Sequence, residues 1–298
     1  MSAILVLHTG GTIGMAPGPD GFAPSEGVVE TALGHIAPSD ATVIVRSFSP
    51  LIDSAEIGAD DWNHIIDEIA GFEGTGVILT HGTDTMAFTG AALAQALAGI
   101  EMPVILCGAM HALDTGGDAE DNLALALEAA QTFAPGVWLA FGGQVLPAAG
   151  LVKVHSQETI AFKAVPQSPV ATPAGPRRFG PCRLAILTLS PGLPAMAVGA
   201  MLRRLDGAVL RVYGAGTTMS DPALMQSLSE ATARGCRIRA VSQCLEGGLT
   251  PGAYAAGAAL WRAGIENGGT QTPEAAFAQL WLELSSERER IGPVPEAF

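Results

Sequence analysis

Short, mainly apolar runs recur along the first half of the chain. They lie at residues 3–7, 76–80, 103–107 and 137–141, and polar positions do not alternate with apolar ones in them. A strand covered by helices on both faces has this pattern, whereas a strand with one face in water alternates. We therefore predict that these runs are buried strands of a parallel sheet.

The segments between these runs have the spacing of helices that bury one face. Small and apolar residues recur there at intervals of three and four: Met86, Gly90, Leu93 and Leu97 in one segment, and Leu123, Leu127 and Ala130 in the next. Strands that alternate with helices over short connections are typical of an α/β domain built on a parallel sheet.

The pattern is interrupted at residues 165–182, where proline is frequent and no periodicity is present. This segment is predicted to be a linker between an N-terminal domain of residues 1–164 and a smaller C-terminal domain of residues 183–298. Beyond it the alternation resumes, with strands expected at 184–189, 208–213 and 238–243 and helices near 198–205 and 223–234. We thus expect two α/β domains, the N-terminal one larger.

The last helix has a clear predicted start. Thr272 is a favourable N-cap and Pro273 suits the first helical position. A stripe of large apolar residues follows at helical spacing and is expected to be buried: Phe277, Leu280, Trp281 and Leu284.

Composition excludes several classes of protein. The 298 residues are 48% hydrophobic and 15% charged, which suits a packed core and argues against disorder. The net charge of −14 disfavours binding to nucleic acid or to anionic membranes. No apolar run approaches the ~18 residues that suggest a membrane span. The N-terminal stretch lacks the basic start and cleavage site of a signal peptide, so a cytoplasmic location is expected.

The four cysteines show no metal-ligand spacing. Cys107, Cys182, Cys236 and Cys244 are expected to be free thiols, and we expect no metal and no cofactor.

Two similar stretches follow predicted strands. "LHTGGTIGM" occupies residues 7–15 and "LTHGTDTM" occupies residues 79–86. Ligands of parallel sheets bind outside the carboxyl ends of the strands. Glycines such as Gly11 and Gly82 let the backbone approach a ligand, and the surrounding amides can form an oxyanion hole. A threonine hydroxyl in such a turn is a candidate nucleophile.

Each motif also has an ordinary structural interpretation. A Gly-Gly-Thr turn is often only a turn, and Asp84 before a helix is a standard N-cap. His8 and His81 are interpreted as structural residues rather than catalytic ones. The first motif is not a phosphate loop, and it does not match the dinucleotide fingerprint.

Taken together, the motifs resemble the bacterial-type asparaginase family, the two-domain threonine amidohydrolases. The resemblance covers nearly the whole chain, and its variants are most similar to the cytoplasmic type I branch. The matching stretches are "TGGTIGM", "PLIDSAEI", "HGTDTM", "LVKVHSQETIAFKA", "RVYGAGT" and "VSQCLEGG".

The resemblance implies catalytic roles at matching positions. Thr12 would attack the side-chain amide carbon of the substrate, and Thr83, Asp84 and Lys153 would form a second triad that moves protons. Lys153 is one of only two lysines, and an ammonium can lose its proton on burial whereas a guanidinium cannot. The backbone amides of Thr12 and Thr83 would face the developing oxyanion.

The resemblance also implies a substrate-binding set. Ser54 would bind the α-carboxylate with backbone help from Asp53 and Ala55, and Asp84 would also bind the α-ammonium. The carbonyl of Ala109 would receive the leaving amide.

Two positions depart from the family pattern. The family carries a tyrosine on a mobile loop after the first motif, where it helps to activate the nucleophile, and the matching residue here is Phe22. Ala55 stands where the family often has glutamine or serine. A water held by Asp84 and Lys153, or the carboxylate of Glu56, is then a candidate replacement base.

The implied activity is conversion of L-asparagine to L-aspartate and ammonia by an enzyme that forms a homodimer or a dimer of dimers. Glutamine is longer than asparagine by one methylene, which changes the binding free energy in an apolar pocket by only about 1–3 kcal/mol. The sequence therefore does not decide which of the two amides is preferred. One alternative is an amino-acid-binding or weakly active family member that lost full catalysis with the tyrosine. Another is the amidase part of a tRNA-dependent amidotransferase, against which the acidic charge argues.

Overall fold

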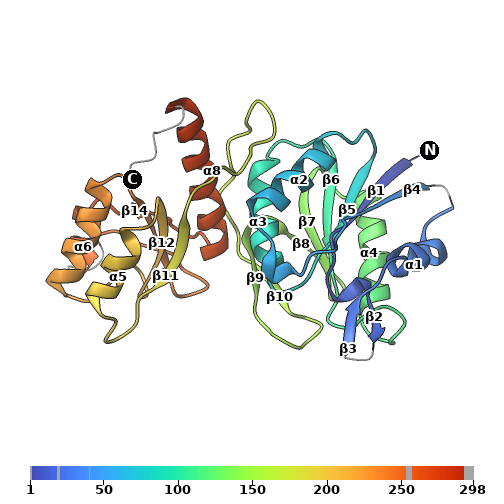
Figure 1. The fold of residues 1–298 in the computed structure, drawn as a ribbon, viewed down its shortest axis with the longest axis horizontal. Coiled ribbons are helices and arrows are strands. Elements are labelled where there is room, and N and C mark those ends of the chain that lie inside the picture. Colours follow the sequence, from blue (N-terminus) through green and yellow to red (C-terminus); the bar gives the residue numbers. More distant parts are fainter. Residues whose placement is uncertain (1, 19–20, 40, 253–256, 292–298) are drawn as a thin grey trace. The chain divides into compact units, whose positions relative to one another are not determined.

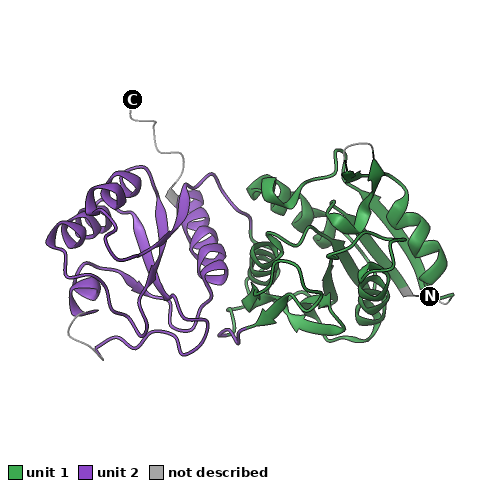
Figure 2. Cartoon of the chain, turned by 90° about the horizontal axis from the view of Figure 1, so that it is seen from below, with its two compact units in different colours: residues 1–164, 169–177 green, residues 165–168, 178–298 purple. Residues whose placement is uncertain are grey.

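The computed structural model describes residues 2–18, 21–39, 41–252 and 257–291. The chain divides into two compact units, shown in green and purple in Figure 2. Unit 1 comprises residues 1–164 and 169–177, and unit 2 comprises residues 165–168 and 178–298. The proline-rich segment is therefore shared, with its middle part belonging to unit 1. Arg177 shows how that part is held, because its amide donates to the Ala96 carbonyl and its guanidinium to the Gln95 carbonyl.

Unit 1 contains a six-stranded sheet in which only the last strand is antiparallel to its neighbour. Its strands in spatial order are β4 (Ala41–Ser47), β1 (Ser2–His8), β5 (Gly76–Thr80), β6 (Pro103–Cys107), β7 (Gly136–Phe141) and β8 (Gln144–Pro147). The four predicted buried strands are confirmed as β1, β5, β6 and β7. The pattern did not indicate the two outer strands, β4 and β8, where polar and partly exposed positions interrupt the apolar ones.

Two pairs of helices cover the faces of this sheet (Figure 1). On one face, α1 (Val28–Ile36) and α4 (Ala119–Thr132) pack against side chains such as Ile4 and Val6 of β1. On the other face lie α2 (Ala59–Ala70) and α3 (Met86–Ala96), joined by a hydrogen bond from the Trp62 indole to the Thr89 hydroxyl at 3.0 Å. The helices predicted from the first half of the chain are confirmed as α3 and α4.

Within its described residues, unit 1 also contains two small hairpins and three short 3₁₀ helices. The hairpins are β2 (Met15–Gly18) with β3 (Gly21–Pro24), and β9 (Leu151–Lys153) with β10 (Phe162–Ala164). The 3₁₀ helices are η1 (Thr12–Gly14), η2 (Ser54–Glu56) and η3 (Ala148–Gly150). These elements are too short for a periodic pattern, which is why the sequence did not predict them.

Unit 2 is a second, parallel sheet of β11 (Leu184–Thr188), β12 (Gly207–Val212), β13 (Arg237–Ser242) and β14 (Glu266–Asn267). Side chains of α5 (Ala195–Leu202), α6 (Pro222–Ala233) and α7 (Ala258–Arg262) share one apolar core with this sheet. The long α8 (Pro273–Ile291) forms a second core on Val209 and Val241. The expected two α/β domains are thus present.

The predicted start and buried stripe of α8 are confirmed. The Thr272 hydroxyl accepts a hydrogen bond from the Ala275 amide at 3.2 Å, as an N-cap does. All four residues of the predicted stripe pack in the core between α8 and the sheet. No helix within the described residues is long and apolar enough to cross a bilayer.

A network of charges links β13, β14 and α8. Arg239 is buried and donates to Glu266 and Glu283 at 2.7 and 2.8 Å, and Arg237 contacts the same two carboxylates at 2.7 and 2.6 Å. Burial alone would raise the pKa of Glu266, but hydrogen bonds and charges from both arginines outweigh it and leave the pKa below its ordinary value. The network therefore stabilises unit 2 while Glu266 is ionised.

We predict that Glu266→Gln lowers the free energy of unfolding by about 2 kcal/mol at pH 7, because the charge that pairs with both Arg237 and Arg239 is removed while Arg239 stays buried. The folded-state pKa of Glu266 is lowered, so this stabilisation is present above the ordinary value of 4.5 and is lost as pH falls through the folded value. Urea unfolding followed by circular dichroism should show the difference shrinking below pH 4.5. Exposed Glu289→Gln is the control, and an equal effect there would contradict the prediction.

Candidate active site

The two threonine motifs lie at the same edge of the larger sheet. Strands β1 and β5 are parallel neighbours with His8 opposite Thr80, and β6 continues the row with Cys107 opposite Thr80. Gly11 and Gly82, which follow His8 and Thr80 in their motifs, therefore leave the sheet side by side at its carboxyl edge.

Glycines allow these segments to pack backbone against backbone. A Cβ on Gly11, whose φ is +89°, would lie 2.5 Å from the Gly82 nitrogen. A Cβ on Gly10 would lie 2.3 Å from the Ile52 carbonyl oxygen, and one on Gly82 would lie 2.4 Å from the Ser54 hydroxyl. Any larger residue would force the three segments apart. The first motif, the second motif and the loop around Ser54 therefore form one compact group.

Lys153 joins this group from a distant part of the chain. Its ammonium, at the end of β9, donates to the Thr83 hydroxyl at 2.9 Å and to the Asp84 carboxylate at 2.7 Å. The Lys153 side chain is 19% exposed, while that of Asp84 is 73% exposed. The hydrogen bonds thus connect a buried hydroxyl, a shielded cation and a carboxylate open to a ligand. The structure brings together the three residues predicted as a second triad.

Thr12 begins η1 and is partly buried, directly after the two glycines that contact the other segments. The hairpin of β2 and β3 follows η1, and Phe22 lies on β3 opposite Pro17 with 53% of its surface exposed. Glu56, the alternative base, is also exposed, at the end of η2. Phe22 is therefore about half exposed to solvent.

The loop that carries Ser54 is held by two neighbours. Ser54 is buried, and its carbonyl accepts a hydrogen bond from the Thr85 hydroxyl at 2.6 Å. The Ala55 amide donates to the carboxylate of Asp53, the N-cap of η2, at 3.0 Å, so this amide already has a partner in the protein. The sequence did not predict this role for Thr85, although Thr85 is the second threonine of the "HGTDTM" motif.

Ala109 is buried in the loop that follows β6. A Cβ on Gly108 would lie 2.5 Å from the His81 carbonyl oxygen, so this loop packs directly against the second motif. Asp118 and Asn122, which the sequence analysis did not single out, bond to the loop from α4. An aspartate just before a helix is a common cap, which conceals any other role in the sequence.

Both histidines near the motifs have structural contacts. His8 Nδ1 lies 2.6 Å from the Thr80 hydroxyl, and burial lowers its pKa despite the opposing charge of Glu30. His81 lies 2.6 Å from the Gly82 carbonyl and 2.9 Å from the Thr89 hydroxyl, and burial lowers its pKa to about 4 although the bond to Gly82 opposes this. Their imidazoles are therefore neutral at pH 7 and fix the backbone around the two motifs.

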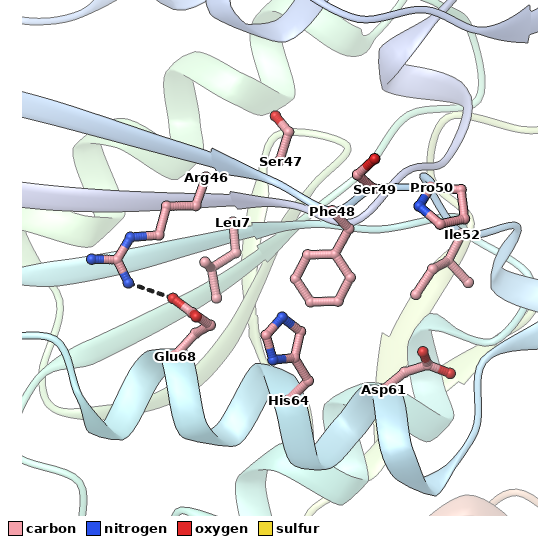
Figure 3. A pocket seen from close by; sticks show the side chains of 10 residues that line it. All are labelled: Leu7, Arg46, Ser47, Phe48, Ser49, Pro50, Ile52, Asp61, His64 and Glu68. Atoms are coloured by element: carbon pink, nitrogen blue, oxygen red, sulfur yellow. Dashed lines mark hydrogen bonds and ion pairs between the residues drawn. The ribbon is translucent and has the colours of Figure 1, made fainter.

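A hollow of about 380 Å³ beside β4 and α2 contains none of the predicted site residues (Figure 3). Arg46 and Glu68 form an ion pair there, and the rings of Phe48 and His64 lie 4.7 Å apart. The Asp61 carboxylate in its lining accepts a hydrogen bond from the Gly58 amide, and the hollow is distinct from the site around Thr83.

Among the described residues, no cluster of three His, Cys, Asp or Glu side chains could hold a metal ion. All four cysteines are free, and of these Cys244 is exposed.

Comparison with known proteins agrees with this architecture. Residues 3–178 match the family described as asparaginase, N-terminal, and residues 183–291 match the glutaminase/asparaginase C-terminal domain. The chain is 31% identical to L-asparaginase 1 of Escherichia coli K12, over 96% of this chain and 92% of that protein.

Solved structures give the same result. The L-asparaginase of Thermococcus kodakarensis has a TM-score of 0.84 at 31% identity, covering 95% of this chain and 93% of that one. L-asparaginase I of Vibrio cholerae has a TM-score of 0.83 at 26% identity, covering 96% and 94%. With both family domains matched and the threonine motifs packed at one sheet edge, the chain belongs to the asparaginase family of amidohydrolases.

Proposed function

We propose that this protein hydrolyses L-asparagine to L-aspartate and ammonia, with Thr12 as the nucleophile. The observation that carries the proposal is the hydrogen-bonded group of Lys153, Thr83 and Asp84, which lies beside the glycines preceding Thr12. A nucleophilic hydroxyl needs a neighbour that takes its proton, and an ammonium bonded to both a hydroxyl and a carboxylate is placed to relay one. The similarity to L-asparaginases supports the same substrate.

In the first step, the Thr12 hydroxyl oxygen forms a bond to the carbon of the substrate's side-chain amide. The hydroxyl proton passes to the group of Thr83, Asp84 and Lys153, from which the leaving nitrogen later takes one, and the amides of Thr12 and Thr83 donate hydrogen bonds to the oxygen that becomes negative. The carbon–nitrogen bond then breaks, and the nitrogen leaves as ammonia after accepting a proton. The β-aspartyl ester of Thr12 is hydrolysed by water, which regenerates the hydroxyl and releases aspartate.

The substrate's backbone groups would be held by Ser54 and Asp84. The exposed Asp84 carboxylate is available to the α-ammonium, and the Ser54 hydroxyl would contact the α-carboxylate. The Ala55 amide would have to release Asp53 before it could assist. Gly11 and Gly82 would line the pocket, because their lack of a side chain leaves the backbone open to a ligand.

The assembly and location are part of the same proposal. We infer a homodimer or a dimer of dimers in the cytoplasm. The free thiols, including exposed Cys244, suit a reducing compartment, and the similarity to L-asparaginase 1 of E. coli supports the type I branch. No metal or cofactor enters the proposed reaction.

Thr12→Ala is predicted to lower kcat on L-asparagine by at least about 10³-fold while the fold is kept, because the variant cannot form the ester. The measurement is ammonia release under saturating substrate, with circular dichroism to check folding. Thr132→Ala, an exposed position at the end of α4, is the control. Retention of most of the wild-type kcat would make Thr12 a turn residue only.

Lys153→Arg is predicted to lower kcat by about 10²–10⁴-fold, because a permanently charged guanidinium cannot release a proton. Lys163→Arg makes the same change at the other lysine, which is exposed on β10, and should leave kcat unaltered. The measurement is the steady-state kcat of both variants on L-asparagine. Near-normal turnover with arginine at 153 would point to a purely electrostatic role.

Phe22→Tyr is predicted to raise kcat on L-asparagine, because the added hydroxyl supplies a polar group that the exposed ring lacks. Stability should change little, since the ring is kept. The kcat values of wild type and variant are compared at the same pH and salt concentration, with Phe133→Tyr, on the surface after α4, as control. An unchanged or lower kcat from a fast wild type would show that another residue activates Thr12. A wild type that binds asparagine without releasing ammonia would favour the binding-protein alternative.

A further inference from the structure

Asp118 stands at the N-cap of α4, but its side chain does not cap the helix. Its carboxylate is turned instead toward the loop that follows β6. The Met110 amide nitrogen lies 3.1 and 3.0 Å from the two carboxylate oxygens, and the His111 amide donates at 2.9 Å. Asn122 Nδ2 donates at 3.0 Å, and the imidazole of His111 lies at 3.3 Å. A buried carboxylate thus forgoes the usual cap and holds a loop.

These contacts determine how the peptide groups around Ala109 are oriented. The Ala109–Met110 bond is trans, so its carbonyl and its N–H point in opposite directions. Because the Met110 N–H points at Asp118, the Ala109 carbonyl points away from Asp118.

Asn122 holds the preceding peptide group. Its Nδ2 donates to the Gly108 carbonyl at 2.9 Å, and its Oδ1 accepts from the Gly142 amide at 2.9 Å. The peptide groups on both sides of Ala109 are therefore held from the α4 side.

The loop also lies against the second threonine motif. The His81 amide donates to the Cys107 carbonyl at 2.8 Å, and the close approach of Gly108 to the His81 carbonyl leaves no room for a side chain. A carbonyl oriented at Ala109 is thus oriented within the same group of segments that carries Thr83.

We propose that Asp118 is a positioning residue that directs the Ala109 carbonyl at the carboxamide of the substrate. This inference rests on the proposed function and deepens it. A carbonyl oxygen accepts a hydrogen bond from the N–H of an amide, but it has nothing to accept from an ester oxygen or a carboxylate. Asp118 therefore determines selectivity for an amide leaving group, without touching the substrate itself.

The test compares two substrates that differ in the leaving group. Asp118→Asn keeps the shape but replaces one acceptor oxygen by an NH₂, which then faces the donors of Met110, His111 or Asn122. We expect kcat/KM on L-asparagine to fall by about 10²-fold, the effect of misplacing a group near the reacting atoms. On L-aspartate β-methyl ester, kcat/KM should fall by less than about 3-fold, because its methoxide leaving group has no N–H.

Asp121→Asn is the matched control, since Asp121 is exposed in the first turn of the same helix. It should leave both values of kcat/KM unchanged, and a selective loss there would overturn the assignment to Asp118. Equal falls of Asp118→Asn on amide and ester, in a protein folded by circular dichroism, would show a structural role and overturn the proposal.

If Asp118→Asn does not fold, Asn122→Ala provides the test, because it removes the bonds to Gly108 and Asp118 and keeps the carboxylate. A loss on asparagine that exceeds the loss on the ester supports the proposal, and equal losses overturn it. The rate of the wild type on asparagine tests the proposed function separately. The ratio of kcat/KM on asparagine to kcat/KM on the ester tests the role proposed for Asp118.

Discussion

The close approach of backbone segments at the carboxyl edge of the larger sheet is the constraint on which the rest of the site depends. Gly11 contacts Gly82, Gly10 contacts the carbonyl of Ile52, and Gly82 contacts Ser54, each at a distance that excludes a Cβ. Neighbouring parallel strands place the motifs at one edge, but only glycine lets them touch. The threonines that follow these glycines are thereby held near one another, and bonds from His8 and Thr9 to Thr80 join the two motifs directly.

Polar side chains from later parts of the chain complete this arrangement. Lys153 reaches the second motif from a hairpin seventy residues further along, and Asp118 and Asn122 hold the Ala109 loop from a helix. These groups are shielded from water, where a hydrogen bond to a charged group is worth more than at the surface. Hydrogen bonds from distant parts of unit 1 therefore hold the site, which is open to solvent at the exposed carboxylate of Asp84.

Position 22 lies outside this group of packed segments. The hairpin of β2 and β3 follows η1 directly, and Phe22 is half exposed on it. Substitution there leaves the packed segments intact, because none of the glycine contacts involves the hairpin strands. The family fold and the second triad are thus compatible with the loss of the tyrosine hydroxyl. This loss affects the activation of the nucleophile rather than the architecture.

The amino-acid sequence by itself determined the elements with a strong periodic signal: four buried strands, the long C-terminal helix with its cap at Thr272, and the two-domain α/β class. The two threonine motifs in the sequence also indicated the family. Only the tertiary structure decided which groups meet. It placed Lys153 on Thr83 and Asp84, turned Asp118 from a helix cap to the Ala109 loop, and tied the Ser54 loop to Thr85. Hydrophobic periodicity records which face of an element is buried, whereas hydrogen bonds between distant segments depend on distances that exist only after the chain has folded.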